Sequence, residues 1–337
     1  MTTTNNNKQF SSHIAFMGLP NSGKSTLLNS LLGVPFSATS QKAQTTRSVI
    51  KGILFEEDIR HFIEDTSFSC DGQLIMLDTP GLNFRPGLLG RHMIQGVQES
   101  VESADIVVWL QDARSLSKNI SFITGEDASP AKEYEWILDR MKKPTSKKQK
   151  WILALTKVDS INKNNLLPLM QKIHSVYGEQ LEVVPIAAIE KKNSRSNLDG
   201  LLKVLVNSSQ DHHQYYEEGQ WTDLKARDFI ANLVRGSIFI HLNQELPYEV
   251  ECCVESVTGA DEGRKAEVEA SIWVSRDGMK GIVLGKGGAM IKKIGTLVRE
   301  NYQKITEQDL VLKLQVKVVP NWPSQPKKLR ELGYEYV

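Results

Sequence analysis

Short apolar runs separated by polar stretches recur along the first two thirds of the chain. The clearest runs are His13–Met17, Leu74–Leu77, Ile106–Leu110, Trp151–Leu155 and Val183–Ile186. Continuous apolar runs of this length are typical of strands in a parallel sheet covered by helices on both faces. Helical patterns occur at Thr26–Leu32, Lys132–Met141 and Leu198–Val206. Ser48–Phe55 and Arg60–Glu64 indicate two further strands, with room for an antiparallel edge. The pattern predicts an α/β fold with a doubly wound, mostly parallel sheet.

A second pattern follows the polar stretch Ser208–Trp221. A helical repeat runs from Thr222, a candidate N-cap, to Asn243. Then come apolar alternations and a glycine-rich turn, which predict two strands, a short helix, a glycine loop, a long helix and a last strand. The two strands span Tyr248–Thr258 and Lys265–Arg276. The long helix spans Ala289–Ile305, and the last strand spans Leu310–Val319. This order predicts a small α+β domain. We therefore divide the chain into a disordered tail (1–12), an α/β domain (13–207), a linker (208–221) and a second domain (222–337).

The composition is that of a soluble globular protein. With 337 residues, the chain can hold two cores, and its formal net charge of +1 means that any nucleic-acid surface must be local. No apolar run is long enough to span a membrane, and the N-terminus lacks the apolar core of a secretory signal. We expect a cytoplasmic protein. The cysteines form neither a disulfide framework nor a zinc spacing, so we expect the neighbours Cys252 and Cys253 to be buried or half-buried thiols.

The stretch Gly18–Ser25 reads GLPNSGKS and fits the phosphate-binding loop G-x-x-x-x-G-K-[ST] between a strand and a helix. Gly18 and Gly23 let backbone N–H groups surround phosphate oxygens, and the helix N-terminus adds partial positive charge. We expect Lys24 to reach the β- and γ-phosphates and the Ser25 hydroxyl to bind Mg²⁺. The sequence therefore predicts a nucleotide site at this loop.

Three further short motifs follow in the order of a GTPase. Asp78-Thr-Pro-Gly81 ends a strand, where Asp78 can hold Mg²⁺ through water and the Gly81 amide can sense the γ-phosphate. Thr156-Lys-Val-Asp159 ends another, and the Asp159 carboxylate can accept hydrogen bonds from guanine that adenine cannot donate. Thr46 lies in a polar loop, where its hydroxyl can complete the Mg²⁺ shell in a GTP-dependent switch. Together the motifs predict a GTPase.

A glycine loop distinguishes the second domain. Gly285-Lys-Gly-Gly288 lies between two predicted helices, and Lys280, Lys292 and Lys293 add local positive charge. Glycines allow close approach of a single-stranded nucleic-acid backbone, Lys286 can meet its phosphates, and neighbouring apolar residues can receive bases. A purely structural turn is the alternative interpretation.

At this point the chain resembles the Era family of GTPases. The segments GLPNSGKSTLLN, SQKAQTTR, LDTPGL and TKVD are similar to that family's motifs and stand in the same order. The stretch Ile282–Ile291 resembles the core of a KH domain, and Gln244–Tyr248 and Leu332-Gly-Tyr334 resemble the family's flanks of that domain. The resemblance covers nearly the whole chain beyond the first dozen residues. It implies a P-loop GTPase domain followed by a type II KH domain.

The resemblance also implies a function and a set of site residues. Era proteins are ribosome-assembly GTPases that bind the 3′ end of small-subunit ribosomal RNA through the KH domain, with the GTP state controlling that grip. The catalytic residues would be Lys24, Thr46 and Gly81, and the metal ligands Ser25, Thr46 and Asp78. GTP or GDP would be bound by Gly18, Asn21, Ser22, Gly23, Lys24, Ser25, Thr26, Asp78, Thr156, Lys157, Asp159, Ala187 and Ala188. RNA would be bound by Gly285, Lys286, Gly287, Gly288, Ile291 and Lys292.

The resemblance further implies K⁺ near Asn21, a monomer, and slow intrinsic hydrolysis, because position 82 is leucine and not glutamine. It leaves peripheral membrane association open. Two departures from the family pattern matter. Thr156 replaces an asparagine and loses an amide that can hold guanine or the phosphate loop, so we expect lower affinity. Ala187-Ala188 stands where the family often has Ser-Ala, although the Ala188 amide can still face guanine.

Three alternative functions compete with this interpretation. One is a GTPase of the same class that acts on transfer RNA or at a membrane. Another is a GTPase whose C-terminal domain contacts a protein or membrane partner instead of ribosomal RNA. The last is a P-loop ATPase or kinase, which Asp159 argues against.

Overall fold

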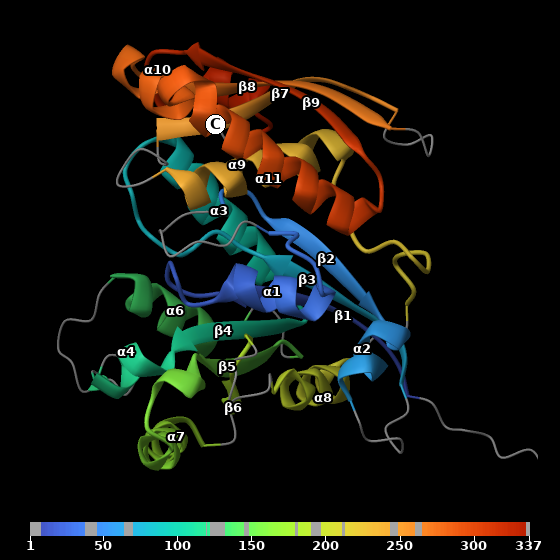
Figure 1. Cartoon of the computed structure of the whole chain (residues 1–337). Coiled ribbons are helices and arrows are strands. Elements are labelled where there is room, and N and C mark those ends of the chain that lie inside the picture. Colours follow the sequence, from blue (N-terminus) through green and yellow to red (C-terminus); the bar gives the residue numbers. More distant parts are fainter. Residues whose placement is uncertain are drawn as a thin grey trace, which may run out of the picture. The chain divides into compact units, whose positions relative to one another are not determined.

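The computed structural model describes residues 8–37, 46–63, 70–118, 120–121, 132–144, 148–178, 181–189, 197–210, 213–242, 249–259 and 265–334 (Figure 1). It forms two compact units. The first consists of Met1–Leu32, Val49–Phe84 and Gly96–Asp223. The second consists of Gly33–Ser48, Arg85–Gln95 and Leu224–Val337. The second unit therefore includes two stretches that the sequence analysis assigned to the first domain.

A six-stranded sheet organises the first unit, in the order β2-β3-β1-β4-β5-β6. Only β2 is antiparallel, and it forms one edge. The strands are β1 (Lys8–Met17), β2 (Ile50–Phe55), β3 (Cys70–Asp78), β4 (Ile106–Asp112), β5 (Lys150–Thr156) and β6 (Glu182–Ile186). The helices are α1 (Lys24–Leu32), α2 (Glu56–Phe62), α3 (Leu88–Ser103), α4 (Ala113–Lys118), α6 (Lys132–Lys142), α7 (Lys163–Tyr177) and α8 (Leu198–Ser208). Helix α3 begins in residues of the second unit and ends in the first.

The central strands are buried along almost their whole length. Every residue of β4 except the last, Asp112, is buried, and so is every residue of β5 except the first, Lys150. Since successive side chains of a strand point to opposite faces, such burial means that both faces of the sheet are covered. The parallel strands then bring their carboxyl ends to one edge, where the loops that follow β1, β3 and β5 carry the nucleotide motifs.

Two predictions for this unit were wrong. Residues 8–12, assigned to the disordered tail, form the start of β1, because Phe10, Ser11 and Ser12 are buried against the sheet. The predicted strand Arg60–Glu64 is replaced by helix α2 as far as the described residues reach. The Asp58 carboxylate accepts the Phe55 N–H, and three acidic residues in the first turn complement the helix dipole.

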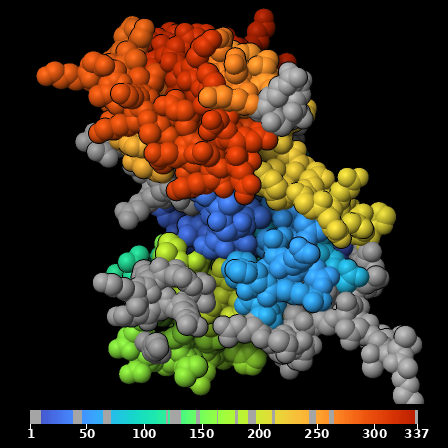
Figure 2. Space-filling view, turned by 45° about the vertical axis from the view of Figure 1, so that its right-hand side comes forward, coloured from blue at the N-terminus to red at the C-terminus, as the bar shows by residue number. Residues whose placement is uncertain are grey.

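Part of the predicted linker belongs to the first unit. Trp221 O accepts a hydrogen bond from the Ile53 N–H of β2 (2.9 Å), and the Thr222 hydroxyl donates to Lys51 O (2.7 Å). Gln73 Oε1 accepts the backbone N–H groups of Tyr215 (3.1 Å) and Tyr216 (3.0 Å). This segment is yellow in Figure 2, beside blue atoms of the first unit. The N-cap prediction for Thr222 was therefore wrong, because its hydroxyl serves β2 and the next helix starts at Ala226.

The second unit holds a three-stranded sheet in the order β7-β8-β9, with β7 antiparallel and β9 parallel to β8. The elements are α9 (Ala226–His241), β7 (Val250–Thr258), β8 (Ala266–Val274), α10 (Asp277–Leu284), α11 (Ala289–Thr306), β9 (Leu310–Val318) and α12 (Pro326–Glu331). Through β9, this is the predicted order of elements. Helix α12 is an addition that the sequence analysis missed. Cys252 and Cys253 are buried, as expected, and burial raises the pKa of both thiols.

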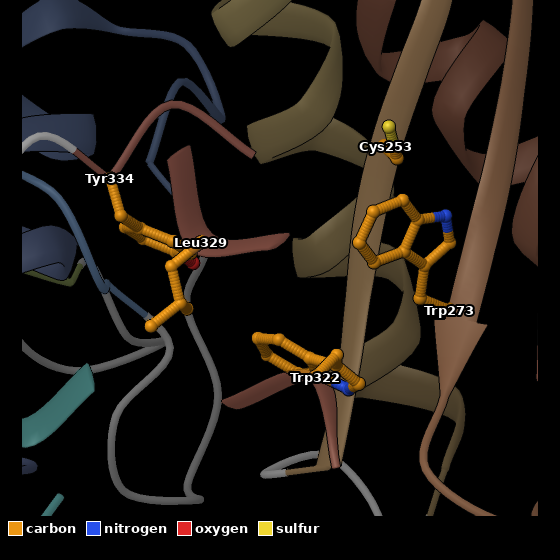
Figure 3. Close-up of a cluster of buried hydrophobic side chains, with 5 residues drawn as sticks. All are labelled: Cys253, Trp273, Trp322, Leu329 and Tyr334. Atoms are coloured by element: carbon orange, nitrogen blue, oxygen red, sulfur yellow. The ribbon is translucent and has the colours of Figure 1, made fainter. Parts of the chain in front are cut away.

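A cluster of Cys253, Trp273, Trp322, Leu329 and Tyr334 holds the C-terminal segment of this unit in place (Figure 3). Leu88 and Leu89, from the start of α3, pack against the same cluster. Burial of these large side chains explains why the stretch 85–95 groups with the second unit. Among the described residues, no helix combines the length and apolar character needed to cross a bilayer.

Candidate functional site

The loop after β1 has the backbone that the phosphate-binding motif predicts. Gly18 has φ of 154°, and a Cβ at this position would lie 2.4 Å from Leu110 O, so only glycine fits. Gly23 has φ of 103°, and Asn21 adopts the left-handed region with φ of 64°. Ser22 is buried, and Ser25 and Thr26 occupy the first turn of α1. The structure therefore brings the predicted loop residues into one turn before a helix N-terminus.

The Lys24 side chain lies in the turn that its own loop makes. Its Nζ donates to Gly18 O (3.1 Å), Leu19 O (3.0 Å) and Ser22 Oγ (3.3 Å). Burial lowers the pKa of Lys24 to about 8, although the charge of Asp78 acts in the opposite direction. A buried ammonium held by carbonyls and one hydroxyl is a favourable place for phosphate oxygens, which would restore its full charge.

Ser25 and Asp78 come from different elements and meet at one point. The Ser25 hydroxyl donates to Asp78 Oδ2 at 2.7 Å, and the Asp78 side chain is fully buried at the end of β3. A hydroxyl and a carboxylate oxygen in contact are hard oxygen ligands of the kind that Mg²⁺ prefers. The donor set therefore fits Mg²⁺, which would neutralise developing charge on the phosphates when bound.

The D-T-P-G loop packs directly on the phosphate loop. The Leu82 N–H donates to Gly18 O (2.9 Å), and the Thr79 hydroxyl donates to Phe16 O (2.8 Å). A Cβ on Gly81 would lie 2.9 Å from the Cα of Pro20, so glycine is required for this contact. The Leu82 side chain is fully buried and cannot orient a water molecule. The contact brings Gly81 next to Pro20 of the phosphate loop, and its role as a γ-phosphate sensor stays a prediction.

The T-K-V-D motif is also tied to the phosphate loop. The Thr156 hydroxyl donates to Ser22 O at 2.7 Å and is buried. A hydroxyl therefore makes the bond to the phosphate loop that the lost amide could have made, and the lower affinity expected for Thr156 stays a prediction. Lys157, at φ of 58°, donates to Asn21 O (2.7 Å) and to Asp112 Oδ2 (2.9 Å).

Asp112 is a site residue that the sequence analysis missed. Burial acts to raise the pKa of Asp112, but the hydrogen bond and charge of Lys157 outweigh it, and the pKa is below its ordinary value. Asp112 therefore stays ionised and holds Lys157 in place. The position of Asp112 at the end of β4, where the neighbouring strands carry motifs, was a signal that could have identified it.

The guanine end of the site is formed by the ends of β5 and β6. Asp159 lies half-buried in the short 3₁₀ turn Val158–Ser160. Ala187 and Ala188 follow β6, and the Ala187 N–H donates to Asn197 Oδ1 (2.6 Å), while Asn197 Nδ2 donates to Pro185 O (2.9 Å). Asn197, also missed from sequence, therefore holds the backbone on either side of Ile186 in place.

The glycine loop of the second unit is open to a ligand. Gly285, Gly287 and Gly288 have φ of 69°, 59° and 79°, and a Cβ on Gly287 or Gly288 would have no neighbour within 4 Å. Lys286 and Lys292 are exposed, and Ile291 is half-buried. Beside them on α10, Ile282 exposes 47% of its surface. The structure thus gathers glycines, lysines and an exposed apolar side chain at one helix–helix turn.

Thr46 belongs to the second unit, unlike the other predicted metal ligands. It is 4% exposed, and Arg47 beside it is 1% exposed. Arg47 donates to Glu251 Oε2 (2.8 Å), a contact that no sequence motif indicates.

Comparisons with known proteins agree with both halves of this description. The model of a family described as 50S ribosome-binding GTPase matches residues 13–157, and the KH domain model matches residues 245–323. GTPase Era of Mycolicibacterium paratuberculosis is 30% identical over 325 residues, which are 96% of this chain and 98% of the relative.

Two solved structures are similar over nearly the whole chain. One is an Era variant from Aquifex aeolicus bound to GDP and tetrafluoroaluminate, with a TM-score of 0.79, 31% identity and coverage of 96% and 99%. The other is Era in complex with MgGDPNP and nucleotides 1506–1542 of 16S ribosomal RNA, with a TM-score of 0.79, 31% identity and coverage of 97% and 99%. With a phosphate loop, a guanine-binding motif and a KH domain in one chain, and with these relatives, the protein belongs to the Era family of GTPases.

Proposed function

We propose that this GTPase is a switch protein that binds the 3′ end of small-subunit ribosomal RNA through its KH domain and assists assembly of the small subunit. The observation that carries the proposal is its similarity, over 97% of the chain, to the Era structure that holds a 16S ribosomal RNA fragment. The open glycine loop with Lys286 and Lys292 supports it, because such loops accept single-stranded backbone and lysines meet phosphates.

For the reaction we propose that Lys24 binds the β- and γ-phosphates, that the Gly81 amide donates to the γ-phosphate, and that Asp159 accepts from guanine. Ser25, Asp78 and Thr46 would hold Mg²⁺, and Asn21 would help to hold K⁺. Ser25 and Asp78 support this through their mutual hydrogen bond. Since Leu82 is buried, backbone groups must orient the attacking water, and we expect slow intrinsic turnover. We place the protein in the cytoplasm as a monomer.

The test is binding of a labelled oligonucleotide with the sequence of the 16S RNA 3′ end, measured with a GTP analogue, with GDP and without nucleotide. We expect tight binding that depends on the nucleotide, and a loss of about tenfold or more in K286E and K292E, because each removes and reverses a phosphate contact. K304E is the matched control, since Lys304 is an exposed lysine at the far end of α11.

Absence of binding in every nucleotide state, with GTP bound normally, would refute the ribosomal proposal and leave the GTPase. Equal binding by K286E, K304E and the unchanged protein would favour the alternative that the C-terminal domain contacts a protein or membrane partner.

A further inference from the structure

The Glu251 carboxylate is the centre of a buried polar cluster in the second unit. Oε1 accepts from Arg235 Nε (2.8 Å) and from the Cys252 N–H (2.9 Å). Oε2 accepts from Arg47 Nη1 (2.8 Å) and from the Tyr334 hydroxyl. Burial acts to raise the pKa of Glu251, but the two arginines outweigh it and hold the pKa well below its ordinary range. Glu251 is therefore ionised.

Arg47 is held on every side. It also donates to Val250 O (3.1 Å), and its guanidinium carbon lies 5.8 Å from the ring centroids of both Phe239 and Trp322. Contacts of an arginine with a carboxylate, a carbonyl and two aromatic faces are those of a fixed side chain. Arg235 contacts the same carboxylate (2.8 Å), so Glu251 faces two buried arginines, one from α9 and one from the stretch before β2.

The stretch that contains Arg47 has a second anchor. Phe36, earlier in the same stretch, is 1% exposed, and its ring centroid lies 5.9 Å from that of Phe229 on α9. Two separate positions of the stretch that follows α1 are therefore fixed to the KH unit. Thr46 lies directly beside Arg47, with Cα atoms about 3.8 Å apart.

The stretch after the D-T-P-G motif reaches the same cluster. His92 of α3 is 5% exposed, and its ring meets that of Tyr334 edge-on, with centroids 4.9 Å apart. Tyr334 therefore contacts the stretch of His92 directly. It is linked to the stretch of Arg47 through the Glu251 carboxylate, to which the Tyr334 hydroxyl donates. The segments that follow two nucleotide motifs converge on Glu251 and Tyr334.

We propose that Arg47 is a positioning residue: Glu251 of the KH unit holds it, it fixes Thr46 next to it, and through it the nucleotide state and RNA binding influence each other. This inference rests on the proposed function in that it takes Thr46 as the metal-binding residue and RNA as the KH ligand. Because coupling between two binding sites is reciprocal, RNA should change the affinity for GTP by the same factor by which GTP changes the affinity for RNA.

The experiment compares R47M, the conservative R47K and the matched control R235M, which removes the other arginine from the same carboxylate. The ratio of oligonucleotide affinities with GTP analogue and with GDP is measured for each. In the unchanged protein we expect a ratio of about five or more, in the range of ordinary allosteric coupling. R47M should bring it close to one with GDP affinity unchanged, R47K should restore part of it, and R235M should lower thermal stability but keep the ratio.

A second readout does not involve RNA. If Arg47 fixes Thr46, R47M should lower kcat and raise the Mg²⁺ concentration that half-saturates the rate, while R235M should change neither. No RNA binding by the unchanged protein would refute the proposed function, but the Mg²⁺ readout would still decide about Arg47. An R47M protein with an unchanged ratio and unchanged Mg²⁺ dependence, or an R235M protein with the same losses as R47M, would overturn the inference.

Discussion

Each unit buries a cationic side chain, Lys24 in the first and Arg235 in the second, and burial disfavours the charge of both. The groups around the two cations differ, and so do the resulting pKa shifts. Lys24 is surrounded by carbonyl oxygens and a hydroxyl, and burial lowers its pKa to about 8. For Arg235, burial also acts to lower the pKa, but the Glu251 carboxylate outweighs it, so the pKa is raised. Lys24 lacks a full counter-charge, which a bound phosphate would supply. Arg235 already has a counter-charge in Glu251, and the pair therefore belongs to the structural core of the second unit.

Lys24 lies in a candidate binding site, whereas Glu251 lies in a structural cluster. Both sites are buried and highly polar, so neither burial nor charge separates them. The difference lies in what accepts the hydrogen bonds: neutral oxygens that a phosphate can replace at Lys24, and an ionised carboxylate with four donors at Glu251. An anion that approached Glu251 would meet an ionised carboxylate whose two oxygens are already taken up by four donors.

The largest expected effect is at Glu251, which contacts Arg47 and Arg235. E251Q removes the negative charge between two buried arginines and should lower the free energy of unfolding of the second unit by about 3–5 kcal/mol. Denaturant-dependent hydrogen–deuterium exchange of peptides from the second unit measures it, because tryptophans in both units would contribute to a fluorescence signal. The exposed pair Lys313–Glu269 of the same unit provides the control, and E269Q should cost about 1 kcal/mol or less. Equal effects of the two variants would mean that burial is irrelevant to the pair.

The next effect is a pH dependence at Lys24. A lysine whose pKa is depressed loses its proton as the pH rises above about 8, whereas the nucleotide-bound state requires the proton. GDP affinity should therefore be constant below pH 7 and about tenfold lower at pH 9. Calorimetry at pH 8.5 in buffers of different ionisation enthalpy should show uptake of about 0.8 proton on binding. Binding without proton uptake would show that Lys24 stays charged without ligand.

The smallest effect concerns the bond between Thr156 and Ser22. T156V removes the hydroxyl but keeps the shape, so GDP affinity should fall by about fivefold, the equivalent of one neutral hydrogen bond of about 1 kcal/mol. T156S keeps the hydroxyl and should stay within about twofold of the unchanged protein. Equilibrium titration with a fluorescent GDP analogue measures both. A T156V protein with full affinity would mean that the Thr156–Ser22 hydrogen bond does not contribute to nucleotide binding.

Much of the first unit could be predicted because its information is local. Apolar runs placed five strands within a few residues of their observed ends, since a buried parallel strand is apolar on both faces. Helix α2 was misread as a strand because its stability comes from an N-terminal carboxylate and not from an apolar stripe. Helix α7 was missed, and Pro168 within it interrupts the helical pattern.

The site divides in the same way. Short motifs identified the residues of the phosphate loop, because spacing within one loop fixes their geometry. The partners of Lys157 and Arg47, which lie in two other motifs, were missed, since Asp112 is 45 positions from Lys157 and Glu251 is 204 positions from Arg47. In a sequence, such isolated charged residues read as surface positions, and only the fold brings each to its partner.

The contact of residues 221–222 with β2 has a practical consequence for dissecting the protein. Strand β2 is an edge strand, and an edge with bare N–H and C=O groups invites pairing with another chain. Trp221 and Thr222 occupy that edge at Ile53 and Lys51. The segment that connects the GTPase domain to the KH domain therefore also covers part of the β2 edge and hinders its pairing with another chain. A GTPase fragment cut at residue 207 would lose this cover, whereas one cut after Asp223 would retain it.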